Sequence, residues 1–270
     1  MQMNKRRILP HPRTACIVAA LLMPACPRAQ GAQDSHPYAS PWRTPWDYDG
    51  ARGSEHWGDL DPAYAACRGK EQSPIDIEDT QKTSLPPLRF EYQGGPLKYV
   101  INNGHTIRVN YYAPGSGDFL IVGDRRYELI QFHFHHPSEE YIHGKRFDMV
   151  LHLIHEARDG AAADVAILLK MGGANRTIRQ IWEHMPRKEG QNMPSGIKIN
   201  PADLLPRDTA SYYTYTGSVT APPCTEGVTW FVLKTPVTIS AQQIKAFAEL
   251  YPADVRPVQP LNGRAVKESR

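Results

Sequence analysis

The chain has 270 residues, of which 41% are hydrophobic and 22% charged, a length that suits one large domain with a sizeable core. Its formal net charge is +3, but residues 1–31 hold five of the 31 basic residues and none of the 28 acidic ones, so the remaining 239 residues carry a net charge of −2. This balance removes the compositional support for nucleic-acid binding, and no later apolar run approaches the length of a membrane span.

Residues 1–31 are predicted to be an export signal. Four basic residues precede an apolar run at 15–22 that is too short to cross a bilayer, and Ala29-Gln30-Gly31 is suited to cleavage before Ala32. We therefore expect a periplasmic or secreted protein. Lipid anchoring at Cys26 is the alternative, because Met23-Pro24-Ala25-Cys26 loosely resembles a lipoprotein box.

Residues 32–45 are polar and contain three prolines, which predicts a flexible N-terminal segment ahead of a single domain at 46–270. Short alternating segments punctuated by Gly, Pro and Asn indicate a mostly β (α+β) fold: a large central, mainly antiparallel twisted sheet with short surface helices. The predicted strands are 98–101, 106–112, 127–135, 147–155, 165–171 and 228–233. The predicted helices are 178–184 and 241–250, and Ser240 is suited to cap the second.

Two histidines on one predicted strand are the first sign of a metal site. Side chains alternate across a strand, so His133 and His135 share one face while Phe132 and Phe134 point to the other. A His-x-His pair alone is weak evidence. The second strand adds His152, and three neutral imidazoles with one open position describe a catalytic zinc site.

Zinc would lower the pKa of a bound water from ~15.7 to ~7 and so supply hydroxide at neutral pH. Hydroxide in a partly apolar pocket attacks small electrophiles such as carbon dioxide or an activated ester. The ligands alone therefore leave a zinc hydrolase as a competitor.

The two cysteines beyond the leader are Cys67 and Cys224. An even count in an exported chain favours one disulfide over metal ligation, with two free buried thiols as the alternative. The closed loop would exceed a hundred residues and contribute roughly 4–5 kcal/mol in the chain-entropy model.

Several segments between Trp46 and Arg264, read together, resemble the alpha carbonic anhydrases, and the exported bacterial form is nearest. Besides the histidine segments these are Glu55-His56-Trp57-Gly58, Gln72-Ser73-Pro74-Ile75-Asp76-Ile77, Asn102-Asn103-Gly104-His105, Ser138-Glu139, Ser218-Val219-Thr220-Ala221-Pro222-Pro223-Cys224 and Arg256-Pro257-Val258-Gln259-Pro260-Leu261. The resemblance implies a zinc lyase (carbonic anhydrase, or carbonate dehydratase) that hydrates carbon dioxide reversibly to bicarbonate and a proton through zinc-bound hydroxide. It also implies a disulfide between Cys67 and Cys224.

The resemblance implies a role for each matching residue. His133, His135 and His152 match the zinc ligands, and Gln131 matches a hydrogen-bond partner of a ligand histidine. Thr220 matches the acceptor of a hydrogen bond from the hydroxide, Glu139 the carboxylate that accepts from Thr220, and His105 the proton shuttle, for which a pKa near ~6.5 is suited. The proton path corresponds to Tyr48, Asn102 and Asn103, and the apolar wall that holds carbon dioxide to Ile154, Val219, Val228 and Trp230.

Two departures from the family matter most. Val150 stands where the family has a Glu that pairs with the third ligand, while Glu140 stands where the family has a His. We therefore expect Glu140 to reach His152 and replace the missing partner. Asp164 falls where the family has an apolar pocket residue, and because a desolvated charge is expensive, we expect a different local register or an outward-pointing side chain.

These departures keep a carbonic-anhydrase-like binding or scaffold protein with weak or no turnover as the alternative function. An esterase using the same zinc chemistry is a third reading, although no segment forms a pocket for a larger acyl group. Bacterial relatives are often dimers, so the resemblance allows a homodimer.

Overall fold

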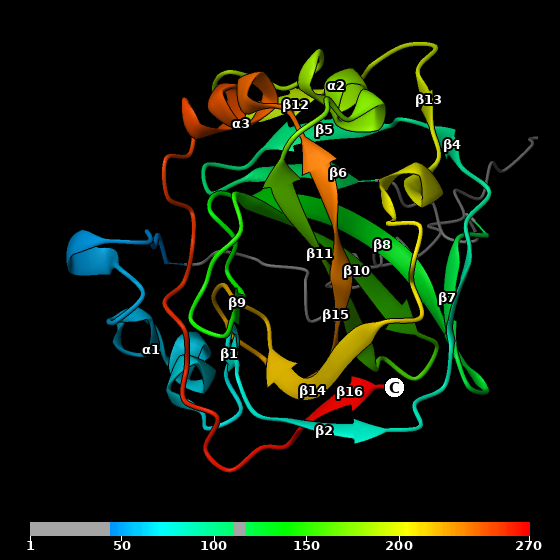
Figure 1. The fold of residues 1–270 in the computed structure, drawn as a ribbon. Coiled ribbons are helices and arrows are strands. Elements are labelled where there is room, and N and C mark those ends of the chain that lie inside the picture. The colour runs from blue at the N-terminus through cyan, green and yellow to red at the C-terminus, as the bar shows by residue number, and fades with distance from the viewer. Residues whose placement is uncertain (1–43, 111–116) are drawn as a thin grey trace, which may run out of the picture. The chain divides into compact units, whose positions relative to one another are not determined.

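The computed structural model describes residues 44–110 and 117–270, all of which belong to the second of two compact units, His36–Arg270 (Figure 1). The predicted signal peptide, Cys26 and nearly all of the predicted flexible segment 32–45 lie outside the described residues. Within the described part of the chain, no helix combines the length and apolarity needed to cross a membrane.

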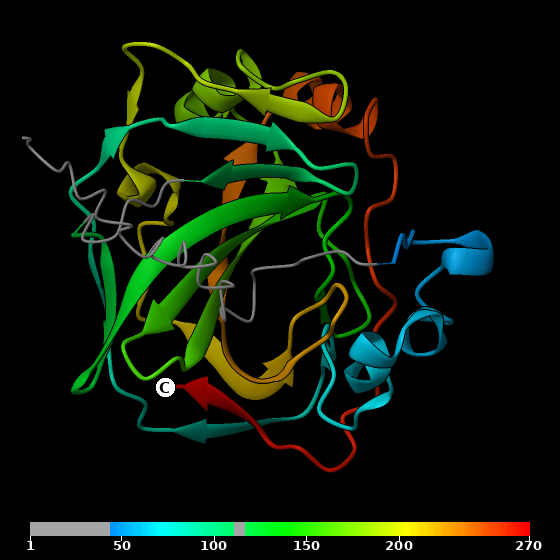
Figure 2. The ribbon, with the colours of Figure 1, turned by 180° about the vertical axis from the view of Figure 1, so that it is seen from behind.

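A 12-stranded twisted sheet forms the body of this unit (Figures 1 and 2). Its main path runs β12-β5-β6-β8-β10-β11-β15-β14-β16-β2, while β7 pairs with β8 and β3 pairs with β7. The bounds are β2 Thr80–Thr83, β3 Leu88–Glu91, β5 Tyr99–Asn102, β6 Ile107–Asn110, β7 Phe119–Val122, β8 Arg125–His135, β10 Met149–Ala157, β11 Ala162–Met171, β12 Gly190–Asn192, β14 Tyr212–Ser218, β15 Glu226–Ile239 and β16 Val266–Ser269.

Smaller elements surround the main sheet. Two short two-stranded sheets pair β1 (Asp76–Ile77) with β9 (Tyr141–Ile142) and β4 (Gly95–Pro96) with β13 (Lys198–Ile199). The helices are α1 Trp57–Leu60, α2 Arg176–Trp182 and α3 Ala241–Ala248, with 3₁₀ turns η1 Gly50–Arg52, η2 Pro62–Arg68 and η3 Pro201–Leu204.

The predicted fold class is confirmed. Within the main sheet only the β11–β15 and β16–β2 pairs are parallel, and the other pairs are antiparallel. Each of the six predicted strands coincides with an observed strand, apart from residues 111–112, which lie outside the described residues. Both predicted helices are helices, and they begin or end within a few residues of the prediction.

The central strands are buried on both faces, because residues of alternate parity pack into two different cores. On β8, Phe132 and Phe134 enter the larger core, which also holds Leu151 and Leu153 of β10. The other face holds a second core that includes Val150 and, from β15, Trp230 and Val232. His133 and His135 of β8 and His152 of β10 lie on this second face, whereas His155 of β10 faces the larger core, where its Nε2 is 2.6 Å from the Tyr92 hydroxyl.

Local sequence explains where the longer helices begin. The Ser240 side chain accepts from the backbone N–H of Gln243, and Gln243 in turn accepts from the N–H of Ser240, a capping box that starts α3. Asn175 caps α2 through the N–H of Ile178. The two helices lie together at one end of the sheet, away from β14 and β16 (Figure 1).

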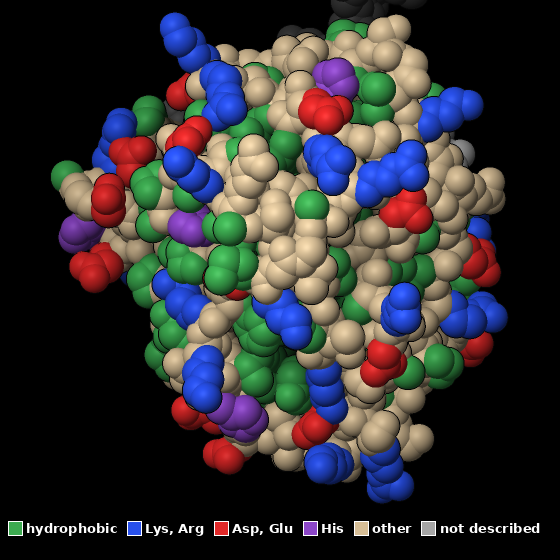
Figure 3. Space-filling model, turned by 45° about the horizontal axis from the view of Figure 1, so that its top comes forward, with side chains coloured by type: hydrophobic (Ala, Val, Ile, Leu, Met, Phe, Trp, Pro, Cys, Tyr) green, Lys and Arg blue, Asp and Glu red, His purple; other side chains and the backbone are tan. Residues whose placement is uncertain are grey.

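A third, smaller core joins the N-terminal part of the unit to the segment after β14. It contains Trp46, Trp57, Tyr64 and Cys224, and Cys224 forms a disulfide with Cys67. The predicted disulfide is therefore confirmed. On the molecular face in Figure 3, basic and acidic side chains are interspersed, in keeping with the near-neutral charge of residues 32–270.

Candidate metal centre

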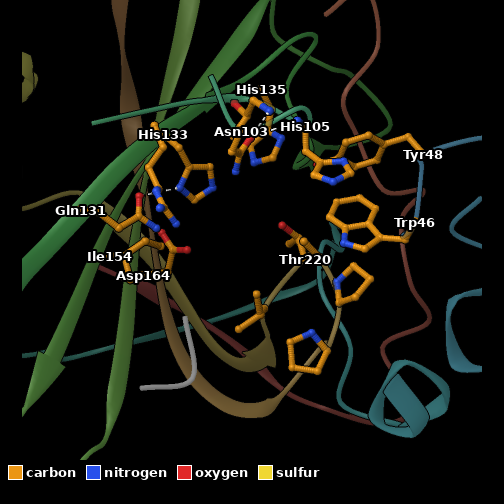
Figure 4. A pocket seen from close by; sticks show the side chains of 16 residues that line it. Trp46, Tyr48, Asn103, His105, Gln131, His133, His135, Ile154, Asp164 and Thr220 are labelled. Atoms are coloured by element: carbon orange, nitrogen blue, oxygen red, sulfur yellow. Dashed lines mark hydrogen bonds between the residues drawn. The ribbon is translucent and has the colours of Figure 1, made fainter. Parts of the chain in front are cut away.

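Three imidazoles converge on the second face of the sheet. His133 and His135 come from β8 and His152 from β10, and the strand register sets His152 directly opposite His133. One ring nitrogen of each histidine lies within 4.8 Å of the corresponding nitrogens of the other two. The rings of His133 and His135 line a cavity of about 80 Å³ together with residues of β6, β11 and the segment after β14 (Figure 4).

The other nitrogen of each ring donates a hydrogen bond to an acceptor. His133 Nδ1 is 3.1 Å from Gln131 Oε1, and His135 Nδ1 is 2.6 Å from the carbonyl oxygen of Asp254. His152 Nε2 is 2.9 Å from Glu140 Oε1. Since these oxygens act only as acceptors, each ring carries its proton on the side facing the partner and directs a lone pair towards the other two rings.

Two of those inward nitrogens, His135 Nε2 and His152 Nδ1, are buried and have no hydrogen-bond partner among the described residues. A buried polar atom without a partner is costly, so this arrangement needs an occupant. Three imidazole nitrogens with outer hydrogen-bond partners are the donor set that a catalytic zinc ion takes, with its fourth position left open. The residues therefore fit zinc.

Glu140 makes the contact that the sequence suggested. Both Glu140 and His152 are fully buried, and Val150, which lies two residues before His152 on the same face of β10, has no polar atom to offer the ring. Burial alone would lower the pKa of His152, but the Glu140 and Asp164 carboxyls reverse this and raise it to about 10. The hydrogen bond to Glu140 Oε1 holds one ring proton on Nε2, and the raised pKa means that without a metal ion Nδ1 also binds a proton at neutral pH, which zinc would displace.

Glu139 also lies beside the centre, next to His135. Its Oε1 accepts a hydrogen bond of 2.8 Å from the backbone N–H of Arg256, and its Oε2 is 3.6 Å from His135 Nε2. Burial raises the pKa of Glu139 to about 7, although His152 and hydrogen bonds from Arg256 and Thr220 oppose the rise. Thr220 lines the cavity beside His133 and His135 (Figure 4).

His105 lines the outer part of the cavity and stacks on Trp46, with ring centroids 3.7 Å apart and planes 7° from parallel. Tyr48 meets the same imidazole edge-on. Burial lowers the pKa of His105 to about 4, although Asp47 opposes this. The expectation of a value near ~6.5 is therefore wrong for the stacked ring, because it ignored the desolvation that stacking imposes.

The two asparagines before His105 play different parts. Asn103 lines the cavity, and its Oδ1 accepts from the backbone N–H groups of His105 and Thr106, which shapes the turn. Asn102 is buried and is not among the cavity residues. Its side chain donates to the carbonyl of Pro186 and accepts from the Tyr251 hydroxyl.

The expected apolar wall is divided in two. Ile154 and Val219 line the cavity, whereas Val228 and Trp230 are buried behind it, and the Trp230 ring centroid is 5.1 Å from that of His152.

The expectation for Asp164 is wrong on both counts. The register is regular, with Asp164 opposite Ile154 on β10 and Trp230 on β15, and the side chain lines the cavity (Figure 4). The sheet order explains this result. Even-numbered residues of β11 lie on the same face as the ligand histidines, so the Asp164 side chain is directed to that face.

Three features of the site do not follow from the sequence. Trp46 covers His105, and Arg108 of β6 lies opposite His133 with its Nε buried and without a partner among the described residues. The carbonyl of Asp254 supports His135. The alternation of β6 carries a signal for Arg108, but using it requires knowing that β6 pairs with β8. A main-chain oxygen carries no side-chain signal at all.

Comparison with known proteins gives a consistent result. Residues 52–270 match the family model described as eukaryotic-type carbonic anhydrase. A carbonic anhydrase from Nostoc sp. is 42% identical over 231 residues, covering 83% of this chain and 86% of that protein, and one from Neisseria gonorrhoeae is 40% identical over 263 residues, covering 95% and 98%. The alpha-carbonic anhydrase of Thermovibrio ammonificans, solved with the inhibitor sulfanilamide, matches with a TM-score of 0.79 and 41% identity, covering 83% of this chain and 99% of that one.

Proposed function

This chain belongs to the eukaryotic-type (alpha) carbonic anhydrase family, and from that premise we propose that it hydrates carbon dioxide reversibly to bicarbonate and a proton at a zinc ion held by His133, His135 and His152. The observation that carries the proposal is the convergence of three imidazole nitrogens whose outer partners fix the tautomer of each ring. Zinc bound there supplies hydroxide at neutral pH by lowering the pKa of its water to ~7.

Thr220 and Glu139 orient the attacking oxygen in this proposal. The Glu139 carboxylate accepts a hydrogen bond from the Thr220 hydroxyl, so the Thr220 oxygen is left to accept a hydrogen bond from the nucleophile. A lone pair of the nucleophile then faces the substrate, which lies against Ile154 and Val219. The backbone N–H of Thr220 is suited to stabilise the negative charge that develops on the substrate oxygen.

His105 carries the released proton to solvent in this proposal, by way of water ordered near Tyr48 and Asn103. Asn102 acts indirectly, because its hydrogen bonds hold the turn that presents His105. The stacked ring accepts a proton weakly, since its pKa is about 4. The His105 ring therefore takes up a proton more readily when it has moved away from Trp46 and is in contact with water.

Replacing His105 with alanine is expected to lower kcat about tenfold and leave kcat/KM nearly unchanged. The loss is smaller than the ~100-fold typical of a general acid or base, because water in the open cavity takes over part of the transfer. Stopped-flow hydration assays in weak buffer measure both constants. Imidazole added as buffer should restore kcat, and His184→Ala, which changes a histidine distant in sequence from the centre, should match the wild type. An equal fall in kcat and kcat/KM would contradict the shuttle role.

The function itself is tested on the mature protein with its zinc content measured on the same sample. The zinc-loaded protein is expected to hydrate carbon dioxide far above the spontaneous rate, to lose this on chelation and to regain it with added zinc. Zinc-loaded protein without turnover would instead support the scaffold alternative, for which the carboxyl group of Asp164 in the cavity is the specific observation. Ester turnover without hydration would support the hydrolase. Export and a homodimer stay predictions.

A further inference from the structure

Asp164 places a carboxyl group on the inner wall of the cavity. Its strand neighbours are Ile154 and Trp230, and its side chain lines the same cavity as His133 and His135 (Figure 4). The residue is 3% exposed, and its Oδ1 has no hydrogen-bond partner among the described residues. Packing does not account for a carboxyl group here, because the strand neighbours on both sides are hydrophobic residues.

The charged groups near Asp164 do not neutralise it. Burial raises the pKa of Asp164 to about 8; His152 opposes the rise, while the carboxyls of Glu140 and Glu139 add to it. His152 already donates its ring proton to Glu140, and no ion pair joins Asp164 to a basic residue in the part of the chain described. Arg108 lines the same cavity, but it too forms no ion pair with Asp164 among the described residues, so Asp164 Oδ1 needs another partner on the cavity side.

Water is the partner that fits. The cavity of about 80 Å³ exceeds the ~30 Å³ that one water molecule occupies in the liquid, and a buried water needs two to four polar partners. Asp164 offers one such partner, and Thr220 and Gln131 line the same cavity. Carbon dioxide cannot donate a hydrogen bond and accepts one only weakly, so it cannot reproduce the bonds of a water held there.

We propose that Asp164 is a specificity-determining residue that binds a water molecule against the inner wall of the cavity, so that carbon dioxide must displace this water to reach the metal centre. The inference rests on the proposed function. In it, Asp164 sets the affinity for carbon dioxide and not the rate of the chemical step. Displacing a well-ordered water with a group that cannot replace its hydrogen bonds weakens binding. The wild-type protein therefore binds carbon dioxide less well than its ligand set alone would allow.

The kinetic test compares two substitutions of similar size. Asp164→Val removes the hydrogen-bonding group, and we expect kcat/KM for hydration to rise about tenfold, equivalent to ~1.4 kcal/mol, with kcat unchanged because proton export follows binding. Asp164→Asn keeps the shape and remains polar, so it should gain less than about threefold. Unchanged kcat/KM in Asp164→Val, or equal gains in both variants, would overturn the proposal. Thermal unfolding establishes that each variant is folded.

A crystal structure tests the water directly and needs no activity. We expect a water within hydrogen-bond distance of the Asp164 carboxyl in the wild type and of the introduced amide in Asp164→Asn, and none there in Asp164→Val. The absence of an ordered water beside the Asp164 carboxyl in the wild-type crystal would overturn the proposal. Failure of the proposed function is distinct, because it would appear as inactive zinc-loaded wild-type protein whatever the crystals show.

Discussion

Replacing Glu140 with leucine is expected to weaken zinc binding about 100-fold, the upper end of the range for loss of a ligand's outer partner. Glu140 Oε1 is 2.9 Å from His152 Nε2, and both side chains are fully buried. Leucine leaves the ring N–H without an acceptor and removes the carboxylate that makes the imidazole a stronger base. The ring is then free to turn or to change tautomer, and either movement withdraws Nδ1 from the metal.

Competition with a chromophoric chelator measures this affinity, and matched variants separate the causes. Glu140→Gln retains an acceptor oxygen without the charge, so its loss should be about tenfold. His152→Ala removes the ligand itself and gives the zinc affinity of a site that lacks it. Wild-type affinity in a folded Glu140→Leu protein would contradict the positioning role of Glu140.

A paired substitution tests the exchange of partners. The double variant Glu140→His and Val150→Glu returns both positions to the residues usual in the family, and it should recover most of the zinc affinity lost in Glu140→Leu. Val150→Glu alone should unfold at lower denaturant concentration, because it buries a second carboxylate on the face that already holds Glu140. A single Val150→Glu variant as stable as the wild type would show that these two positions are not in contact.

Removing the disulfide is expected to lower the free energy of unfolding by about 5 kcal/mol. Cys67 and Cys224 are separated by 157 residues, and in the chain-entropy model a loop of this length restricts the unfolded chain strongly. The folded state should change little. Gln72 Nε2 donates to the Cys224 carbonyl and Arg256 donates to the Cys67 carbonyl, so hydrogen bonds keep both segments in place.

Urea unfolding of the variant carrying Cys67→Ala and Cys224→Ala measures the loss, and reduction of the wild-type protein with dithiothreitol provides an independent comparison. The two should agree, because each removes the same covalent link. A decrease below about 1 kcal/mol in both would show that the unfolded chain gains little freedom when the link is cut.

The sequence predicts those parts of the centre that follow from strand periodicity. His133 and His135 share a face because they are two residues apart, and the helix cap at Ser240 is likewise a local signal. Asp164 was misplaced because its direction depends on which face of β11 meets the histidines, and that depends on sheet order. The stack of Trp46 on His105 joins residues from distant segments, so no local pattern predicts it.

The stack of His105 on Trp46 has a consequence for acidic surroundings. At pH 5, an imidazole with an ordinary pKa of ~6.5 is almost fully protonated and cannot take up another proton. With its pKa lowered to about 4, the stacked ring carries a proton in roughly one molecule in ten at the same pH. At this pH the stacked ring would thus remain an empty proton acceptor, where a histidine exposed to solvent would be saturated.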